Sequence, residues 1–220
     1  MASKKKDPHL AASKNKEGLA HYANWAVDEA VAAFEQAIRA DPDNPEYHLN
    51  LARAFARSSD YHQAMSALGN YLRTETDEKI AERFERMFSS ALDEVETVLI
   101  ETLRKHETPV QQIGKAIQMW LEYRITIGRT QLRILKPELW AAALTHAVGK
   151  VNFTQRKLAD VAAMYKVPER SLREKYQELV STLDVMPADY RYFVGEQNPL
   201  DKLVEAARVL EELDRHFQED

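Results

Sequence analysis

The chain has 220 residues, of which 45% are hydrophobic and 30% charged, and its net charge is −5, as expected for a globular protein with a buried core. It contains no cysteine, which excludes disulfides, thiolate metal sites and cysteine nucleophiles. The six glycines are too scattered for a phosphate-binding loop, and no apolar run could span a membrane, so we expect no cofactor, no metal, no catalysed reaction and a cytoplasmic location.

An internal repeat occupies the first third of the chain. Gly18, Ala30 and Phe34 have counterparts 34 residues later, in the order Ala52, Ala64 and Leu68, so that small residues recur at small positions and large residues at large ones. Small residues suit close helix crossings, and bulky apolar residues fill the space between helices. We therefore predict two helix hairpins over about residues 11–77.

This period and pattern resemble the tetratricopeptide repeat. The resemblance implies stacked pairs of antiparallel helices whose first helices line a concave groove for a protein or peptide partner. The groove residues implied in this chain are Lys14, Asn15, His21, His48, Asn50 and Arg53. Two asparagines with basic neighbours suit the carboxylate of a peptide. Trp25 and Ser59 stand in the turns between paired helices, where glycine is common in the family.

Two repeats leave an apolar face that only a further element can cover. Residues 77–106 contain no glycine or proline, and apolar residues recur there at helical spacing. We predict one long helix over this range that caps the repeats and connects them to the second half.

The second half is also predicted to be helical, which makes the fold class all-α. Prolines begin two amphipathic segments, 109–127 and 137–151. The segment 153–183 then predicts a helix-turn-helix, with a first helix capped by Thr154, a break at 166–168 and a second helix over 169–183.

Residues 136–183 resemble the cyclin-like repeat of transcription factor IIB. The match rests on Pro137, Ala141, Ala142, Ala143, Thr154, Gln155, Leu158, Ala159, Val167, Leu172 and Tyr176. About three more residues separate Ala159 from Val167 than that pattern has, and Lys166 replaces its turn glycine. The resemblance implies a cyclin-like helical domain with a helix-turn-helix element.

The charge of this region leaves two interpretations open. Residues 124–176 contain eleven lysines and arginines and four acidic residues, a net charge of +7 in a chain whose total is −5, which is typical of a phosphate-contacting surface. The candidate nucleic-acid contacts are Arg156, Lys157, Lys166, Arg170, Arg173 and Lys175. Glu169, Glu174 and Glu178 interrupt the second helix, which instead favours an ordinary solvated face or a protein-docking surface.

The predicted organisation has three parts: a disordered basic tail over 1–10, a repeat domain over 11–106, and a helical domain over 109–220. A final amphipathic helix over 199–217 either packs back on this domain or forms a homodimer. The leading hypothesis is a non-enzymatic adaptor or scaffold that binds a protein partner through the repeats. The alternative is a DNA-binding transcriptional regulator that uses the basic segment 124–176, and an enzyme would require a site assembled only in space.

Overall fold

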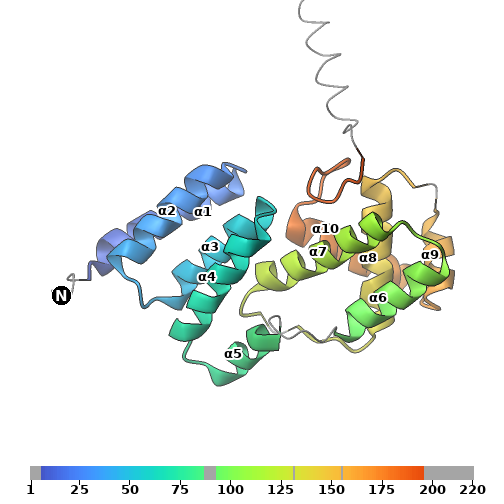
Figure 1. Cartoon of the computed structure of the whole chain (residues 1–220), viewed down its shortest axis with the longest axis horizontal. Helices are drawn as coiled ribbons and strands as arrows, with labels where there is room; N and C mark the ends of the chain where they lie inside the picture. The colour runs from blue at the N-terminus through green and yellow to red at the C-terminus, as the bar shows by residue number, and fades with distance from the viewer. Residues whose placement is uncertain (1–5, 87–92, 131, 155, 196–220) are drawn as a thin grey trace, which may run out of the picture. The chain divides into compact units, whose positions relative to one another are not determined.

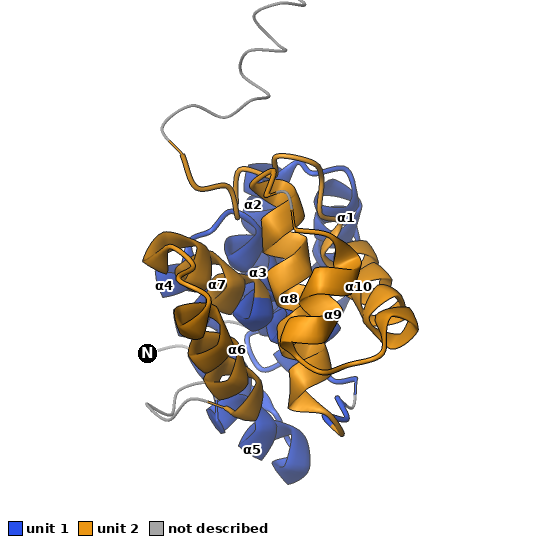
Figure 2. Cartoon of the chain, turned by 90° about the vertical axis from the view of Figure 1, so that its right-hand side faces the viewer, with its two compact units in different colours: residues 1–92, 120–134 blue, residues 93–119, 135–220 orange. Residues whose placement is uncertain are grey.

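The structure is a computed structural model that describes residues 6–86, 93–130, 132–154 and 156–195 (Figure 1). These residues form helices and no strand, which confirms the predicted all-α fold class. The chain forms two compact units: unit 1 holds residues 1–92 and 120–134, and unit 2 holds residues 93–119 and 135–220 (Figure 2). This division differs from the predicted boundary at 106–109, because residues 120–134 group with the repeats.

Unit 1 begins with two helix hairpins that lie side by side (Figure 1). The first joins α1 (Pro8–Ala23) to α2 (Val27–Ala40), and the second joins α3 (Pro45–Arg57) to α4 (Tyr61–Thr74). α2 packs against α3, so the hairpins form a continuous stack. In the turns, Trp25 has φ 61° and Ser59 has φ 63°, the left-handed region that favours glycine.

Short polar side chains set where these helices begin. The Oδ1 atom of Asp7 accepts the Leu10 amide at 3.0 Å, and Pro8 occupies the first helical position, where no amide donor is needed. Asn44 caps α3 in the same way, with Pro45 after it. Residues 8–10 therefore form the first turn of α1, which corrects the predicted disordered tail over 1–10; residues 1–5 lie outside the described residues.

The core of the stack follows the 34-residue period. Ala30 and Ala64 are completely buried at the predicted close crossings, and Phe34 and Leu68 are buried between the helices. Gly18 lies directly against Phe34, since a Cβ atom added there would stand 2.6 Å from two ring carbons. The first hairpin is therefore fixed by a contact that only glycine permits.

We expect Gly18→Ala to lower the free energy of unfolding by about 1–2 kcal/mol, because overpacking against the Phe34 ring exceeds the gain in helix propensity. Gly69→Ala in α4 is the matched control, since an added Cβ meets no atom within 4 Å. It should raise the stability by about 0.5–1 kcal/mol. Urea unfolding followed by circular dichroism measures both, and equal effects of the two variants would contradict the close packing of Gly18.

The long helix predicted over 77–106 is wrong in its continuity. The described residues contain two helices in this range, α5 (Glu78–Glu85) in unit 1 and α6 (Glu94–Lys105) in unit 2. Asp93 has an extended backbone and starts α6 with a capping box, in which Asp93 and Glu96 each accept the backbone amide of the other. This reciprocal cap begins a new helix where the apolar period alone predicted continuation.

Unit 2 is built around α8 (Pro137–Val151), in which every residue from Trp140 to Val148 is buried. A helix that is buried on all sides is a core helix, and α6, α9 (Leu158–Met164) and α10 (Glu169–Leu183) pack on it. α7 (Val110–Ile127) contributes its residues up to 119 to unit 2 and its later residues to unit 1. The helices predicted over 109–127 and 137–151 are confirmed.

The structure changes one detail of the predicted 153–183 element. α9 begins after Lys157, whose amide donates to Asp160 at 3.1 Å, so Thr154 is not its cap. Thr154 instead closes the end of α8, where its amide donates to the carbonyl of Gly149 at 2.9 Å. The break is confirmed, with Lys166 at φ 53°, and α10 has the predicted bounds.

A buried ion pair organises the chain after α10. The Arg191 guanidinium donates to both carboxylate oxygens of Asp189, at 3.0 and 2.7 Å, and to the carbonyl of Leu183. Both side chains are completely buried, so their charges are matched by each other and by backbone groups. The last predicted helix, 199–217, and the homodimer interpretation attached to it lie outside the described residues.

Candidate functional site

Three of the predicted groove residues form one chain of hydrogen bonds in unit 1. The Asn50 amide donates to Asn15 Oδ1 at 2.9 Å, which joins α3 to α1, and Arg53 Nη1 donates to Asn50 Oδ1 at 2.8 Å. Asn50 is only 1% exposed, and burial lowers the pKa of Arg53. The structure therefore brings Asn15, Asn50 and Arg53 together, and their hydrogen-bonding groups largely satisfy one another.

The other three predicted groove residues stand apart from this chain. Lys14 forms an ion pair with Glu17 on its own helix at 2.7 Å, and His21 lies half-buried in the last turn of α1. His48 is buried, and its Nε2 atom donates to the carbonyl of Pro42 at 2.8 Å. His48 thus ties α3 to the turn before it.

The end of α7 covers the side of α3 that carries Asn50 and Arg53. Ile125 is completely buried in the same core cluster as Leu49, and Arg53 Nε donates to the Ile125 carbonyl at 3.5 Å. At Gly128 a Cβ atom would collide with the Arg53 guanidinium, and φ there is +57°. The α7 end therefore approaches α3 as closely as a backbone can.

A second arginine holds the same helix end. Arg83 of α5 donates to the carbonyls of Gly128 and Thr130. The Ile125 carbonyl lies in the last turn of α7, where a helix carries its partial negative charge, and Gly128 and Thr130 form the turn that follows the helix. Arg53 and Arg83 together supply donors to three carbonyls, at residues 125, 128 and 130.

An ion pair completes the contact. Arg129 Nη2 lies 3.0 Å from Glu75 Oε1, and the Glu75 side chain is 0% exposed. Glu75 also accepts hydrogen bonds from the Tyr71 hydroxyl at 2.5 Å and from the amides of Thr76 and Asp77. Burial raises the pKa of Glu75, but the bonds from Tyr71 and the two amides and the charge of Arg129 outweigh it, so its pKa is lowered.

The lowered pKa of Glu75 predicts that unit 1 loses stability in acid and that Glu75→Gln removes this pH dependence. Because the folded state favours the carboxylate, its stabilisation is present above the ordinary pKa of 4.5 and is lost as the pH falls through the folded-state pKa. Relative to wild type, Glu75→Gln should lower the free energy of unfolding by about 1–2 kcal/mol at pH 7 and by much less at pH 3.

Urea unfolding at the two pH values measures the difference. The control is Glu35→Gln, which changes a surface carboxylate paired with Arg39 at 3.5 Å and should have little effect at pH 7. A loss of stability for Glu75→Gln that is the same at pH 3 and pH 7 would show that the Glu75 charge is not what stabilises unit 1.

The basic residues of α10 are paired with acids of the same helix. Arg170 lies 3.0 Å from Glu174, Arg173 lies 2.9 Å from Glu169, and Lys175 pairs with Glu178. Lys175 also lies 4.2 Å from the centre of the Trp140 ring. These acids lower the positive potential that α10 presents.

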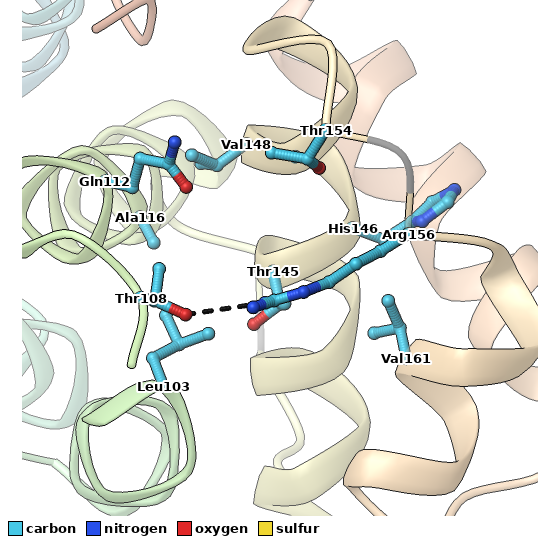
Figure 3. A pocket seen from close by; sticks show the side chains of 11 residues that line it. Leu103, Thr108, Gln112, Ala116, Thr145, His146, Val148, Thr154, Arg156 and Val161 are labelled. Atoms are coloured by element: carbon cyan, nitrogen blue, oxygen red, sulfur yellow. Dashed lines mark hydrogen bonds between the residues drawn. The ribbon is translucent and has the colours of Figure 1, made fainter. Parts of the chain in front are cut away.

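The remaining candidate nucleic-acid residues have separate positions: Lys157 precedes α9, Lys166 forms the turn, and Arg156 faces inward. Figure 3 shows Arg156 reaching across a cavity to the hydroxyl of Thr108, 3.4 Å away.

The cavity beside Arg156 is small. It lies between α6, α7, α8 and α9, and its interior of about 20 Å³ has room for about one water. His146 lines it, packs edge-on against Tyr176, and has a pKa lowered first by burial and then by the charge of Lys150. Within the described residues no group of three or more His, Asp or Glu side chains could hold a metal ion. None of the helices in that part of the chain has the length and apolar character of a membrane span.

Comparison with known proteins gives a family match for the helix hairpins of unit 1. Residues 15–78 match the family model described as tetratricopeptide repeat. This segment is similar to tetratricopeptide repeats. The resemblance predicted for it is confirmed, and residues 136–183, which were predicted to resemble transcription factor IIB, lie outside the match. No curated protein and no solved structure matches the chain.

Three residues that hold the end of α7 in unit 1 were missed by sequence reasoning. Glu75 lies at the end of the match, and Arg83 and Arg129 follow it in sequence. Their charges are ordinary in a chain with 30% charged residues, and 54 residues separate Glu75 from Arg129. The one available signal was Gly128, an isolated glycine that follows an apolar helix and is typical of a helix end.

Proposed function

We propose that the chain is a non-enzymatic adaptor whose tetratricopeptide repeats bind a protein partner. The observation that carries this proposal is the stack of two hairpins over the residues that match the family, because such repeats generally mediate protein–protein interaction. The proposal concerns an interaction and includes no reaction.

The groove of this stack has an open half and a covered half. The side of α3 with Asn50 and Arg53 is covered by the end of α7. The 34-residue register places Lys16 and Leu19 of α1 at the corresponding positions, and both are exposed, Leu19 by 41%. An exposed leucine beside lysines suits a partner segment that is apolar and acidic. The proposed partner surface therefore includes Lys16 and Leu19 together with the predicted Lys14, Asn15 and His21.

Affinity capture with the immobilised full chain tests this surface. We expect a partner that wild type retains to be lost with Lys16→Glu/Leu19→Asp and retained by Glu29→Lys/Glu35→Lys, which changes two exposed residues of α2. Circular dichroism checks that both variants remain folded. A partner lost equally in both variants would move the interaction away from the groove, and the absence of any protein above a mock column would contradict the adaptor function.

A second candidate function is nucleic-acid binding by unit 2. Two observations favour it. Residues 135–176, the part of the basic segment 124–176 that belongs to unit 2, contain eight lysines and arginines and four acidic residues, and the turn between α9 and α10 is short, with Arg170 and Arg173 exposed on α10. The carboxylates paired with Arg170, Arg173 and Lys175 oppose it. The candidate contacts remain Arg156, Lys157, Lys166, Arg170, Arg173 and Lys175.

Fluorescence anisotropy with random duplex DNA decides this candidate. Binding through phosphates should weaken steeply between 50 and 200 mM salt, by about 10³-fold or more for six contacts. It should be lost with Arg170→Glu/Arg173→Glu/Lys175→Glu and retained with Glu29→Lys/Glu35→Lys. If the chain fails to bind duplex DNA at low salt, unit 2 is a protein-docking module.

A further inference from the structure

We propose that the covered half of the groove is a receptor for the C-terminal end of a helix, and that residues 120–130 are its intramolecular ligand in the free chain. This inference rests on the proposed adaptor function and adds the class of partner and the way its access is controlled. A partner helix binds at Arg53 and Arg83 only after the chain's own helix end has left, so the covered half of the groove is closed until such a helix competes.

The first argument is that the two arginines form hydrogen bonds with backbone atoms of residues 120–130. Arg53 donates to the carbonyl of Ile125, and Arg83 donates to the carbonyls of Gly128 and Thr130. The Ile125 carbonyl lies in the last turn of α7, and the Gly128 and Thr130 carbonyls belong to the turn that follows it, so all three contacts are made to backbone atoms and none to a side chain of α7. Any helix end of the same shape can satisfy both arginines.

The second argument concerns the side chains that select among helices. Ile125 fills an apolar position against Leu49, and Gly128 allows an approach that any Cβ would block. Arg129 pairs with Glu75, a completely buried carboxylate. The receptor therefore fits a helix that ends in the pattern apolar–x–x–Gly–Arg, with the glycine in the left-handed conformation.

The third argument is that a partner helix and residues 120–130 would contact the same atoms of α3 and occupy the same volume. Leu49 is 2% exposed and shares a core cluster with Ile125, so no second helix can contact it while the α7 end is in place. A tethered ligand acts at an effective concentration on the order of millimolar. A free helix therefore competes only when its own affinity is high or when the internal contact is weakened.

The test uses a fluorescein-labelled peptide of residues 117–134 and the full chain. Wild type should bind it weakly, because the groove is filled. Gly128→Val weakens the internal contact through the collision with Arg53 and should bind the peptide at least tenfold more tightly. Gly114→Ala, in the same helix but with no atom near the added Cβ, is the matched control and should behave as wild type. A peptide carrying Gly128→Val should not bind any of the three chains.

Two results would overturn the proposal. One is a folded Gly128→Val chain that binds the peptide no more tightly than wild type does, which would make residues 120–130 a permanent part of the core. The other comes from hydrogen exchange on wild type, which keeps the test valid if Gly128→Val fails to fold. The amides of 121–128 should exchange at least tenfold faster than those of Leu51, Ala52 and Ala54 in α3, whereas equal protection would mean that the segment opens only when the repeats unfold.

The adaptor function itself is judged separately. A captured partner that binds wild type and Arg129→Ala equally well would leave the adaptor function standing and reject the covered half as its site. Enhanced capture by Arg129→Ala, which removes the ion pair between the internal helix end and Glu75 and leaves Arg53 and Arg83 in place, supports the closed state.

Discussion

The stack of two hairpins depends on the cover over one side of α3. Leu49 is buried there in one core cluster with Ile125, and Arg53 donates to the Ile125 carbonyl. The end of α7 supplies an apolar residue, Ile125, and carbonyls that accept from Arg53 and Arg83. The end of α7 therefore both buries apolar side chains and supplies hydrogen-bond acceptors. Without these acceptors, the guanidinium of Arg53 would lie away from water with unpaired donors, which would lower the stability of the fold.

The repeat period predicted the parts of unit 1 that depend on local spacing. Ala30, Ala64, Phe34 and Leu68 are buried as expected, because the crossing of two helices a fixed distance apart repeats the same packing requirement. The turns at Trp25 and Ser59 follow the same logic. Proline starts also predicted α7 and α8, since a proline needs no amide partner in the first turn.

The parts that escaped prediction depend on contacts between distant residues. The apolar residues of α7 predicted a buried face. They did not predict that Ile125 packs with Leu49, 76 positions earlier in the chain. Asn50 and Arg53 were predicted to line an open groove because the cover comes from outside the repeats. The sequence signal for the cap at Asp93 is a glutamate three residues later, Glu96. Apolar residues recur at helical spacing on both sides of Asp93, however, and this pattern favoured one continuous helix.

The discontinuity of unit 1 has a consequence for biosynthesis. A ribosome adds about 5–20 residues per second, so α3 emerges several seconds before Ile125 and Gly128. During that interval Leu49 and Asn50 are uncovered while unit 2 has begun to form from residue 93 onward. A nascent chain, or a fragment that stops at residue 106, contains both repeats and lacks their cover. In each of them the surface of α3 that the end of α7 covers in the complete fold is exposed.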